Sequence, residues 1–237
     1  MALSSPTRPP VPRAELTRLL RDLGSEVRRG GDPRETHADL ATGIAALDAL
    51  LGGGLARGRL SELHGPHSSG RTSLALALLA RATERGEVVA VVDPADAFHP
   101  ASARAAGVQL ERVLWARPPG VAEAVRASER LLQARGFAAV LLDAASGDAA
   151  WQALPTAVWQ RLTRAAAAGG SALIVVALHR VTGSHADLAL SLQPTSRARF
   201  TGVPSLFEGI EIEAAIARQR RGPAGRAVAV RLRAASE

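Results

Sequence analysis

The sequence predicts an α/β fold in which helices flank a largely parallel central sheet and antiparallel strands form the C-terminal edge. Between residues 59 and 178, short continuous apolar runs alternate with helical stretches, as buried parallel strands joined by helical crossovers do. After residue 187, apolar and polar residues alternate instead, which is typical of antiparallel strands with one solvated face. The 237 residues, 47% of them hydrophobic, suffice for one large domain with a small extension.

The composition excludes several kinds of chemistry. The chain has no cysteine, which excludes disulfides, zinc–thiolate sites and thiol catalysis. All 29 basic residues are arginine, and the formal net charge of +7 indicates an anionic partner. The N-terminal stretch lacks the apolar core of a signal peptide, and no apolar run reaches membrane-spanning length. A cytoplasmic location is therefore expected, with no membrane partner.

The first 36 residues differ in character from the rest of the chain. Residues 1–13 are rich in proline and serine and are predicted to form a disordered tail. Residues 14–36 are predicted to form an amphipathic helix, up to residue 29, and a linker. This helix docks either on a partner or on the chain's own domain, which is expected at residues 37–237. Its apolar stripe consists of Leu16, Leu19, Leu20, Leu23 and Val27.

The parallel strands are predicted from short apolar runs, each followed by a turn or a helix. They are expected at residues 59–64, 88–93, 112–115, 138–143 and 172–178. Apolar residues at helical spacing predict helices before Gly52, directly after the loop that follows His64, and at residues 121–135 and 151–168. The antiparallel edge is expected around residues 188–192, 210–216 and 228–232.

The loop after the first strand matches a phosphate-binding motif at all positions but one. Its sequence GPHSSGRT fits G-x-x-x-x-G-K-[ST] apart from Arg71, and it lies between a strand and an apolar helix, as the motif requires. Backbone N–H groups and the helix N-terminus would offer partial positive charge to a phosphate. The alternative is a glycine-rich turn before a core helix. The predicted ligand-binding residues are Gly65, Pro66, His67, Ser68, Ser69, Gly70, Arg71, Thr72 and Ser73.

An acidic residue, Asp143, ends the apolar strand at residues 138–143. P-loop nucleoside triphosphatases hold at such a strand end the acid that orients Mg²⁺ through water, while the hydroxyl of the loop binds the metal. Thr72 and Asp143 are therefore the predicted metal ligands, and Asp143 is the predicted catalytic residue if the site is active. Taken alone, an aspartate at a strand end is more often a helix cap or a turn former.

The C-terminal part of the chain is strongly basic. Residues 218–233 contain six arginines and no acid. Such a run either grips nucleic-acid phosphates, in a sequence-independent and salt-sensitive way, or solubilises an edge strand. The predicted DNA-binding or interface residues are Arg180, Arg218, Arg220, Arg221 and Arg226.

The order and spacing of several motifs resemble the RecA recombinase core over about residues 41–232. The resemblance implies a RecA-like P-loop core, ATP and Mg²⁺ as cofactors, and basic side chains such as Arg218 and Arg220 that reach a neighbouring subunit's nucleotide. Its motifs are Thr42-Gly43 and Leu47-Asp48, the loop at residues 65–72, VDPADA at residues 92–97 and VLLD at residues 140–143.

Three positions at which the RecA resemblance implies catalytic groups carry other residues here. Arg71 replaces the lysine of the loop, and its planar guanidinium is wider than a compact ammonium. Ala95 falls where the resemblance implies a glutamate that polarises the attacking water, and Leu178 on or near the glutamine that senses the γ-phosphate. Positioning and charge supply most of the catalysis of phosphoryl transfer, so weak hydrolysis or none is expected. Binding of ATP and Mg²⁺ is expected to be weak or lost.

Within RecA-like proteins the chain resembles the ImuA type, the accessory protein of the bacterial damage-inducible mutagenesis cassette. The compact length, the altered loop and the ending at residues 208–226 carry this resemblance. It implies a role in the SOS response and translesion synthesis, at the nucleoid. The implied partners are RecA, an ImuB-type homologue of Y-family polymerases and an error-prone replicative-type polymerase. Single-stranded DNA is a further partner expected from the basic residues. The alternatives are a DNA-stimulated ATPase, a plain DNA-binding module, and a P-loop protein of the division-inhibitor or RadA/KaiC kind.

Overall fold

The computed structural model describes residues 39–201, 206–220 and 223–233. The chain divides into residues 1–36 and residues 37–237, and all the described residues belong to the second unit. The tail predicted at residues 1–13 and the helix predicted at residues 14–29 lie outside the described residues and stay predictions. Within the described ranges, no helix combines the length and the apolar character needed to cross a membrane.

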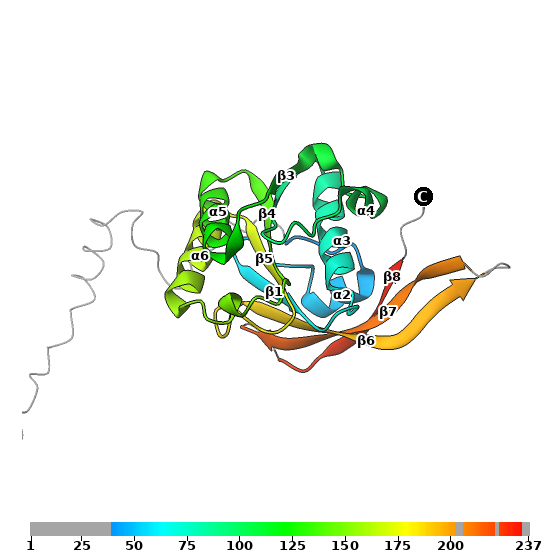
Figure 1. The fold of residues 1–237 in the computed structure, drawn as a ribbon. Helices are drawn as coiled ribbons and strands as arrows, with labels where there is room; N and C mark the ends of the chain where they lie inside the picture. Colours follow the sequence, from blue (N-terminus) through cyan, green and yellow to red (C-terminus); the bar gives the residue numbers. More distant parts are fainter. Residues whose placement is uncertain (1–38, 202–205, 221–222, 234–237) are drawn as a thin grey trace, which may run out of the picture. The chain divides into compact units, whose positions relative to one another are not determined.

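The described residues form one sheet in the strand order β3-β2-β4-β5-β1-β6-β7-β8 (Figure 1). Neighbouring strands from β3 to β1 pair in parallel. β5 is buried along its whole length, because helices cover both faces of this part of the sheet, and its sequence is accordingly a continuous apolar run. The parallel strands are β1 (Leu60–His64), β2 (Val88–Val92), β3 (Val113–Ala116), β4 (Phe137–Ala144) and β5 (Ala172–Ala177).

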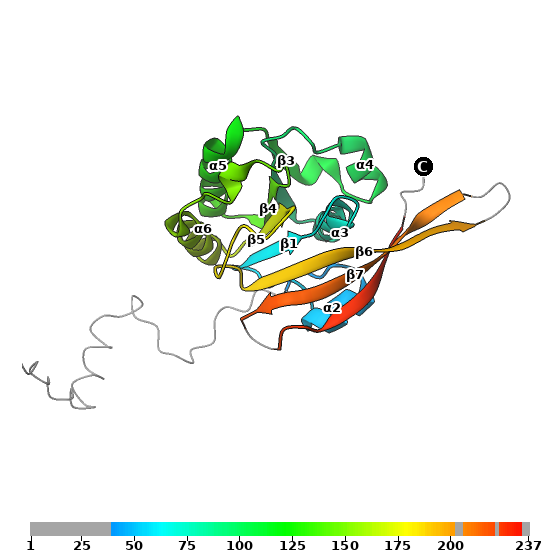
Figure 2. The ribbon, with the colours of Figure 1, turned by 60° about the horizontal axis from the view of Figure 1, so that its bottom comes forward.

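The antiparallel edge consists of β6 (Leu188–Thr201), β7 (Leu206–Gln219) and β8 (Ala227–Arg233). β6 runs parallel to β1 over residues 188–191 and antiparallel to β7, so it joins the two parts of the sheet. Past residue 191, β6 and β7 continue beyond the end of β1, and their distal ends lie away from the helices (Figure 2). The fold class predicted from the sequence is confirmed, including its antiparallel C-terminal edge.

Helices cover the two faces of the sheet and enclose two hydrophobic cores. Successive residues of β2 alternate between them: Val91 packs on the side of α3, and Val92 on the side of α5 and α6. One core involves α2 (Ala45–Leu51), α3 (Arg71–Glu84) and α4 (Pro100–Ala105); the other involves α5 (Gly120–Ala134) and α6 (Thr156–Gly169) (Figure 1). Each fully buried leucine of α3 contributes about 1.5–3 kcal/mol to this packing.

The helix predicted at residues 151–168 starts later in the structure, so the prediction was wrong over residues 151–155. A 3₁₀ turn, η3 (Ala149–Trp151), comes first, and α6 begins at Thr156, directly after Pro155. Proline has no N–H to donate and disfavours a helical residue before it, so it separates the two elements. Trp151 nevertheless packs in the core with α5 and α6, with 1% of its surface exposed. Another 3₁₀ turn, η2 (Leu110–Arg112), precedes β3.

Candidate phosphate-binding site

The predicted phosphate loop lies at the carboxyl end of β1, next to the antiparallel edge. β1 ends at His64 and α3 begins at Arg71, with the loop between them. Gly70 caps α3 with a φ of 81°, in the left-handed region that glycine adopts without strain. Ser68 also has a positive φ, 60°. This strand–loop–helix arrangement directs backbone N–H groups and the positive end of the helix toward one place.

The nine predicted loop residues divide into an exposed and a buried group. The structure brings them together in a single turn of the chain, and their binding of a ligand stays a prediction. The exposed residues are Pro66, His67, Ser68, Thr72 and Ser73, and the buried ones are Gly65, Ser69, Gly70 and Arg71.

The C-terminal strands contact this loop at both of its glycines. A Cβ atom on Gly65 would lie 2.2 Å from the carbonyl oxygen of Leu192 in β6. A Cβ atom on Gly70 would lie 2.5 Å from Cδ1 of Leu232 in β8 and 3.1 Å from Cδ1 of Ile212 in β7. Only glycine permits such close approach at both positions. The loop is thus packed against all three strands of the antiparallel edge.

Three buried polar atoms at the loop have no hydrogen-bond partner among the described residues: Nε2 of His64, Oγ of Ser69 and Nη1 of Arg71. Ser69 is 1% exposed and Arg71 is 7% exposed. Burial lowers the pKa of His64, which favours its neutral ring. Native proteins satisfy nearly all buried polar groups, because an unpaired donor is costly. A phosphate, with several acceptor oxygens, would accept from the Ser69 hydroxyl and the Arg71 guanidinium, so these residues fit the phosphates of the cofactor that the resemblance implies.

Asp93 is a buried acid at the carboxyl end of β2 and holds the backbone of the following turn together. It follows β2 and is 1% exposed. Its carboxylate accepts hydrogen bonds from the N–H groups of Ala97 at 3.0 Å and Phe98 at 2.8 Å, and from the indole Nε1 of Trp115 at 3.2 Å. The aspartate is therefore fully engaged in the turn after β2. An Asp-Pro pair after a strand is typical of a turn, but nothing in the sequence indicates the bond from Trp115.

Asp143, the predicted metal ligand, lies in β4, which neighbours β2 in the sheet. Its Oδ1 accepts a hydrogen bond from the N–H of Ala145 at 2.8 Å. Burial raises the pKa of Asp143 and the negative charge of Asp93 raises it further, whereas the Ala145 N–H and Arg71 act in the opposite direction. Asp143 and Arg71 thus act on each other electrostatically across the carboxyl ends of the strands. Thr72, the other predicted metal ligand, is exposed in the first turn of α3.

Replacing Asp143 with asparagine is expected to raise the thermal midpoint at neutral pH by a few degrees. The pKa of the buried carboxyl is raised in the folded protein, so its ionised form destabilises the fold at any pH above that raised value. The penalty is lost as the pH falls toward the ordinary value of 3.8. Asparagine carries no charge and still accepts the Ala145 N–H. Melting curves of the two proteins should therefore converge at low pH; an equal or lower midpoint for Asp143→Asn at neutral pH would contradict this.

Ala95 and Leu178 stand at two positions where the RecA resemblance implies catalytic groups, and both side chains are apolar. Ala95 is exposed in the turn after β2. Its neighbour Asp96 has a φ of 55° and pairs with Arg117 at 3.4 Å, and Arg117 in turn lies over the ring of Trp115 at 4.8 Å. Asp96 is thus engaged next to the edge strand β3. Leu178, directly after β5, presents an apolar side chain to the loop after β4.

Glu62 in β1 was not predicted from the sequence, although it organises the loop after β5. It is fully buried. Its carboxylate accepts hydrogen bonds from the N–H of Val181 at 2.6 Å, and from the N–H and hydroxyl of Thr182 at 3.2 and 2.5 Å. Nε of Arg180 lies 4.0 Å from Oε2. The signal that was available is a charged residue inside an apolar strand, which proteins rarely leave unpaired.

The arginines predicted to bind DNA or a partner fall into separate groups. Arg180 belongs to the loop between β5 and β6, and Arg218 lies in β7. Both donate hydrogen bonds to backbone carbonyl oxygens of this loop, three in all, at 2.5–3.2 Å. Arg220 is exposed, and its N–H donates to the end of the same loop at 2.8 Å. Arg226 instead donates to a carbonyl oxygen at the C-terminal end of α2 at 2.9 Å. Arg221 lies outside the described residues.

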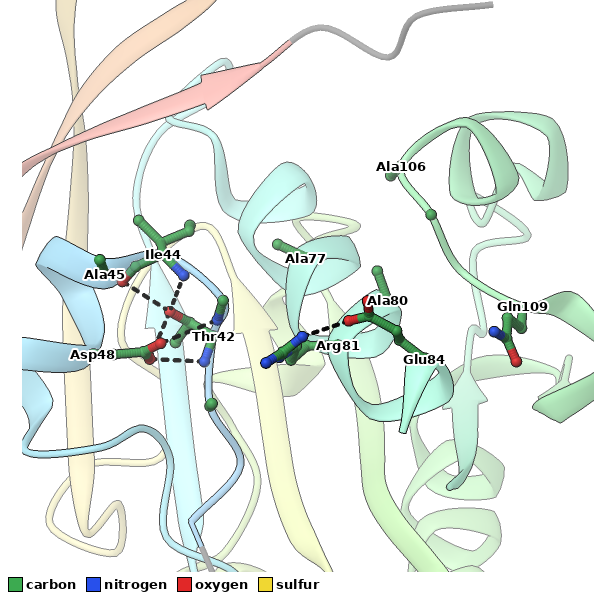
Figure 3. Close-up of a pocket in the computed structure, with 13 residues that line it drawn as sticks. Thr42, Ile44, Ala45, Asp48, Ala77, Ala80, Arg81, Glu84, Ala106 and Gln109 are labelled. Carbon is green, nitrogen blue, oxygen red and sulfur yellow. Dashed lines mark hydrogen bonds and ion pairs between the residues drawn. The ribbon is translucent and has the colours of Figure 1, made fainter. Parts of the chain in front are cut away.

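A cavity of about 650 Å³ lies on the outer side of α3 (Figure 3). Its lining comes from residues 41–48, from the exposed face of α3 and from residues 106–109, and does not include residues 65–73. The carboxylate of Asp48 shapes the first wall. It accepts hydrogen bonds from the N–H and hydroxyl of Thr42 at 2.7 and 2.8 Å, and from the N–H of Gly43 at 3.1 Å. The Thr-Gly and Leu-Asp pairs therefore build a turn that lies against Arg81, in the C-terminal half of α3.

A phosphate loop between a central parallel strand and a helix, with antiparallel strands along one edge, defines a P-loop protein with a RecA-like core. A sequence profile of the RecA N-terminal domain matches residues 16–184. The chain belongs to this family. The resemblance to RecA that was predicted from the motifs is thereby confirmed, whereas the assignment to the ImuA type stays a prediction.

Two RecA proteins illustrate the similarity. RecA of Bifidobacterium longum (strain NCC 2705) is 36% identical over 121 residues, and RecA of Chlorobaculum tepidum is 38% identical over 122 residues. Each alignment covers 51% of this chain but only 30% and 35% of the two RecA proteins, so the chain matches about a third of their length. The crystal structure of the RadB recombinase is similar with a TM-score of 0.65 and 25% identity, over 81% of this chain and 95% of RadB.

Proposed function

We propose that this protein is a RecA-like accessory protein of the DNA-damage response, which binds RecA and translesion polymerases and hydrolyses ATP weakly or not at all. The observation that carries the proposal is the contrast between a well-built phosphate loop and the absence of catalytic groups at two positions beside it. The loop has a left-handed residue, Gly70, at the start of α3, and buried donors on Ser69 and Arg71. It packs closely against β6, β7 and β8. Ala95 and Leu178 offer no group that polarises water or senses a phosphate. Such a site favours ligand-dependent binding over catalysis.

The partners in this proposal follow from the family and from charge. The resemblance to the ImuA type supports RecA as a partner. It also supports an ImuB-type polymerase homologue and an error-prone replicative-type polymerase, at the nucleoid. Single-stranded DNA is supported by Arg180, Arg218 and Arg220, which all contact the loop between β5 and β6 and carry positive charge that fits an anionic backbone.

A DNA-stimulated ATPase is the second candidate, and the position of Asp143 favours it. This acid remains in the strand β4 and interacts electrostatically with Arg71 at the start of α3. P-loop enzymes keep an acid at such a strand end to orient Mg²⁺.

ATP hydrolysis by the purified protein, with and without single-stranded DNA, separates the two candidates. We expect no turnover above background from the wild type. The double variant Arg71→Lys/Ala95→Glu should show measurable turnover, because it restores the lysine and the glutamate that the RecA resemblance implies. Turnover by the wild type that Asp143→Ala abolishes would contradict the accessory role and identify an enzyme.

Capture of RecA by the immobilised full chain tests the partner part of the proposal. We expect RecA to be retained at high salt, because a packed protein interface is screened less than contacts to phosphates. Loss of RecA, combined with DNA binding that falls steeply with salt, would replace the accessory role with that of a plain DNA-binding module.

A further inference from the structure

Arg71 is the feature of the phosphate loop that an accessory role leaves unexplained. It is the first residue of α3, it is 7% exposed, and its Nη1 has no hydrogen-bond partner among the described residues. A second donor on the loop, Oγ of Ser69, is equally without a partner and is 1% exposed. Burial of a guanidinium N–H without an acceptor is unfavourable, so these two side chains are arranged for an anion.

The acids near Arg71 do not supply that anion directly. Asp143 acts on Arg71 electrostatically from β4, without forming a direct ion pair with it. Asp93 already accepts hydrogen bonds from two N–H groups and an indole in its own turn. Arg71 and Asp143 are therefore close enough for their charges to interact, and the guanidinium lacks a complete set of acceptors among the described residues.

A divalent cation bound at Asp143 would have to share this space with the guanidinium. In a loop with lysine, a slim ammonium lies along the phosphates and leaves the strand-end acid free to orient the metal. The guanidinium is wider and fixed in a plane, and two cations close together in a buried site repel each other strongly. The residues of this loop therefore fit the phosphates of the implied cofactor but not its metal.

We propose that Arg71 takes the place of the metal ion, so that residues 65–73 hold a diphosphate or triphosphate group without Mg²⁺. The guanidinium binds two phosphate oxygens at once through its forked N–H groups. The Ser69 hydroxyl and the N-terminal N–H groups of α3 bind the remaining oxygens. The proposal rests on the phosphate site of the proposed function. It specifies the class of ligand that the site binds and the positive charge that balances the phosphates. It also gives a reason for the weak or absent hydrolysis that the proposed function expects, because phosphoryl transfer would lose the cation that bridges the reacting phosphates.

Calorimetric titration of the full chain tests this with three probes: ATP, ADP and inorganic tripolyphosphate, each in Mg²⁺ and in excess EDTA. For the wild type we expect the Kd of ATP to change by less than about threefold between the two conditions. Arg71→Lys should bind at least about tenfold more weakly in EDTA than in Mg²⁺, and Arg71→Met at least about tenfold more weakly than wild type in both. Arg164→Lys, exposed on α6, should behave as the wild type. Tighter binding of ATP than of tripolyphosphate identifies a nucleotide, and equal binding identifies the polyphosphate group alone.

Three results would overturn the proposal: wild-type binding that EDTA abolishes, Arg71→Met that binds as tightly as wild type, or no binding of any probe by the wild type. Melting curves show whether each variant folds, and Arg71→Lys decides the question if Arg71→Met does not. The outcome of this titration does not depend on whether the protein has the proposed accessory role. A protein that captures RecA but needs Mg²⁺ for binding refutes the metal replacement alone. A protein that binds ATP in EDTA but does not capture RecA refutes the accessory role alone.

Discussion

Gly65→Ala is expected to lower the free energy of unfolding by about 3 kcal/mol, or the thermal midpoint by roughly 6–12 °C. The added methyl group would lie 2.2 Å from the carbonyl oxygen of Leu192 and 2.8 Å from Oγ of Ser69. The serine can rotate, but the carbonyl belongs to the backbone of β6, which is paired with β7. Either the strand or the loop must therefore shift. Thermal and denaturant unfolding followed by circular dichroism measures the loss.

Gly136→Ala is the matched control for this change. Gly136 has a φ of 82°, and a Cβ atom there would meet nothing within 4 Å. Alanine at this position bears only the cost of the left-handed backbone, about 1–2 kcal/mol. Gly65 is not in that region, so its loss would come from the close contact alone. If Gly65→Ala destabilises the protein no more than Gly136→Ala, the loop has room that the distances do not show.

Glu62→Ala is expected to cost about 3–5 kcal/mol, the largest effect of a single side-chain truncation that we predict. The change removes the acceptor for the N–H groups of Val181 and Thr182 and for the Thr182 hydroxyl. Each buried donor left without a partner costs about 1–3 kcal/mol. The loop at residues 178–187 should lose its fixed position, so amide hydrogen exchange there should accelerate more than in β4 or β5.

Two further variants separate the hydrogen bonds of Glu62 from a general effect of removing an acid. Glu62→Gln keeps one acceptor oxygen and should cost about 1–2 kcal/mol. Glu84→Ala breaks a pair with Arg81 whose side chains are 45% and 63% exposed, and should cost no more than about 0.5 kcal/mol. Unchanged hydrogen exchange at residues 178–187 in Glu62→Ala would show that the loop is held by other contacts.

Much of the fold could be predicted because its signals are local. Strands such as β5, Ala172–Ala177, are buried on both faces, so their sequences are uninterrupted apolar runs whose ends are easily located. The phosphate loop is equally local, since its nine residues are contiguous. Apolar residues begin to alternate near Leu188, which indicates the antiparallel strands, although β6 is still buried on both faces at residues 188–190 and becomes exposed only from Gln193.

The contacts that could not be predicted join residues far apart in the sequence. Glu62 and Thr182 are separated by 120 positions, and neither residue type specifies the other. Leu232 and Ile212 read as ordinary strand residues, and only the assembled sheet places them against Gly70. Pro155 indicates the late start of α6, whereas apolar spacing alone extends the helix back to residue 151.

The close packing of Gly65 and Gly70 against β6, β7 and β8 has a thermodynamic consequence for regulation. Because the loop and the antiparallel edge share these contacts, a change in the position of one alters the energy of the other. Linkage is reciprocal: if a partner bound to the edge strands increases the ligand affinity of the loop by some factor, the ligand increases the partner's affinity by the same factor. Ligand binding to the loop would then depend on whether the partner is bound to the edge strands. This dependence is a property of the equilibrium and needs no ATP hydrolysis.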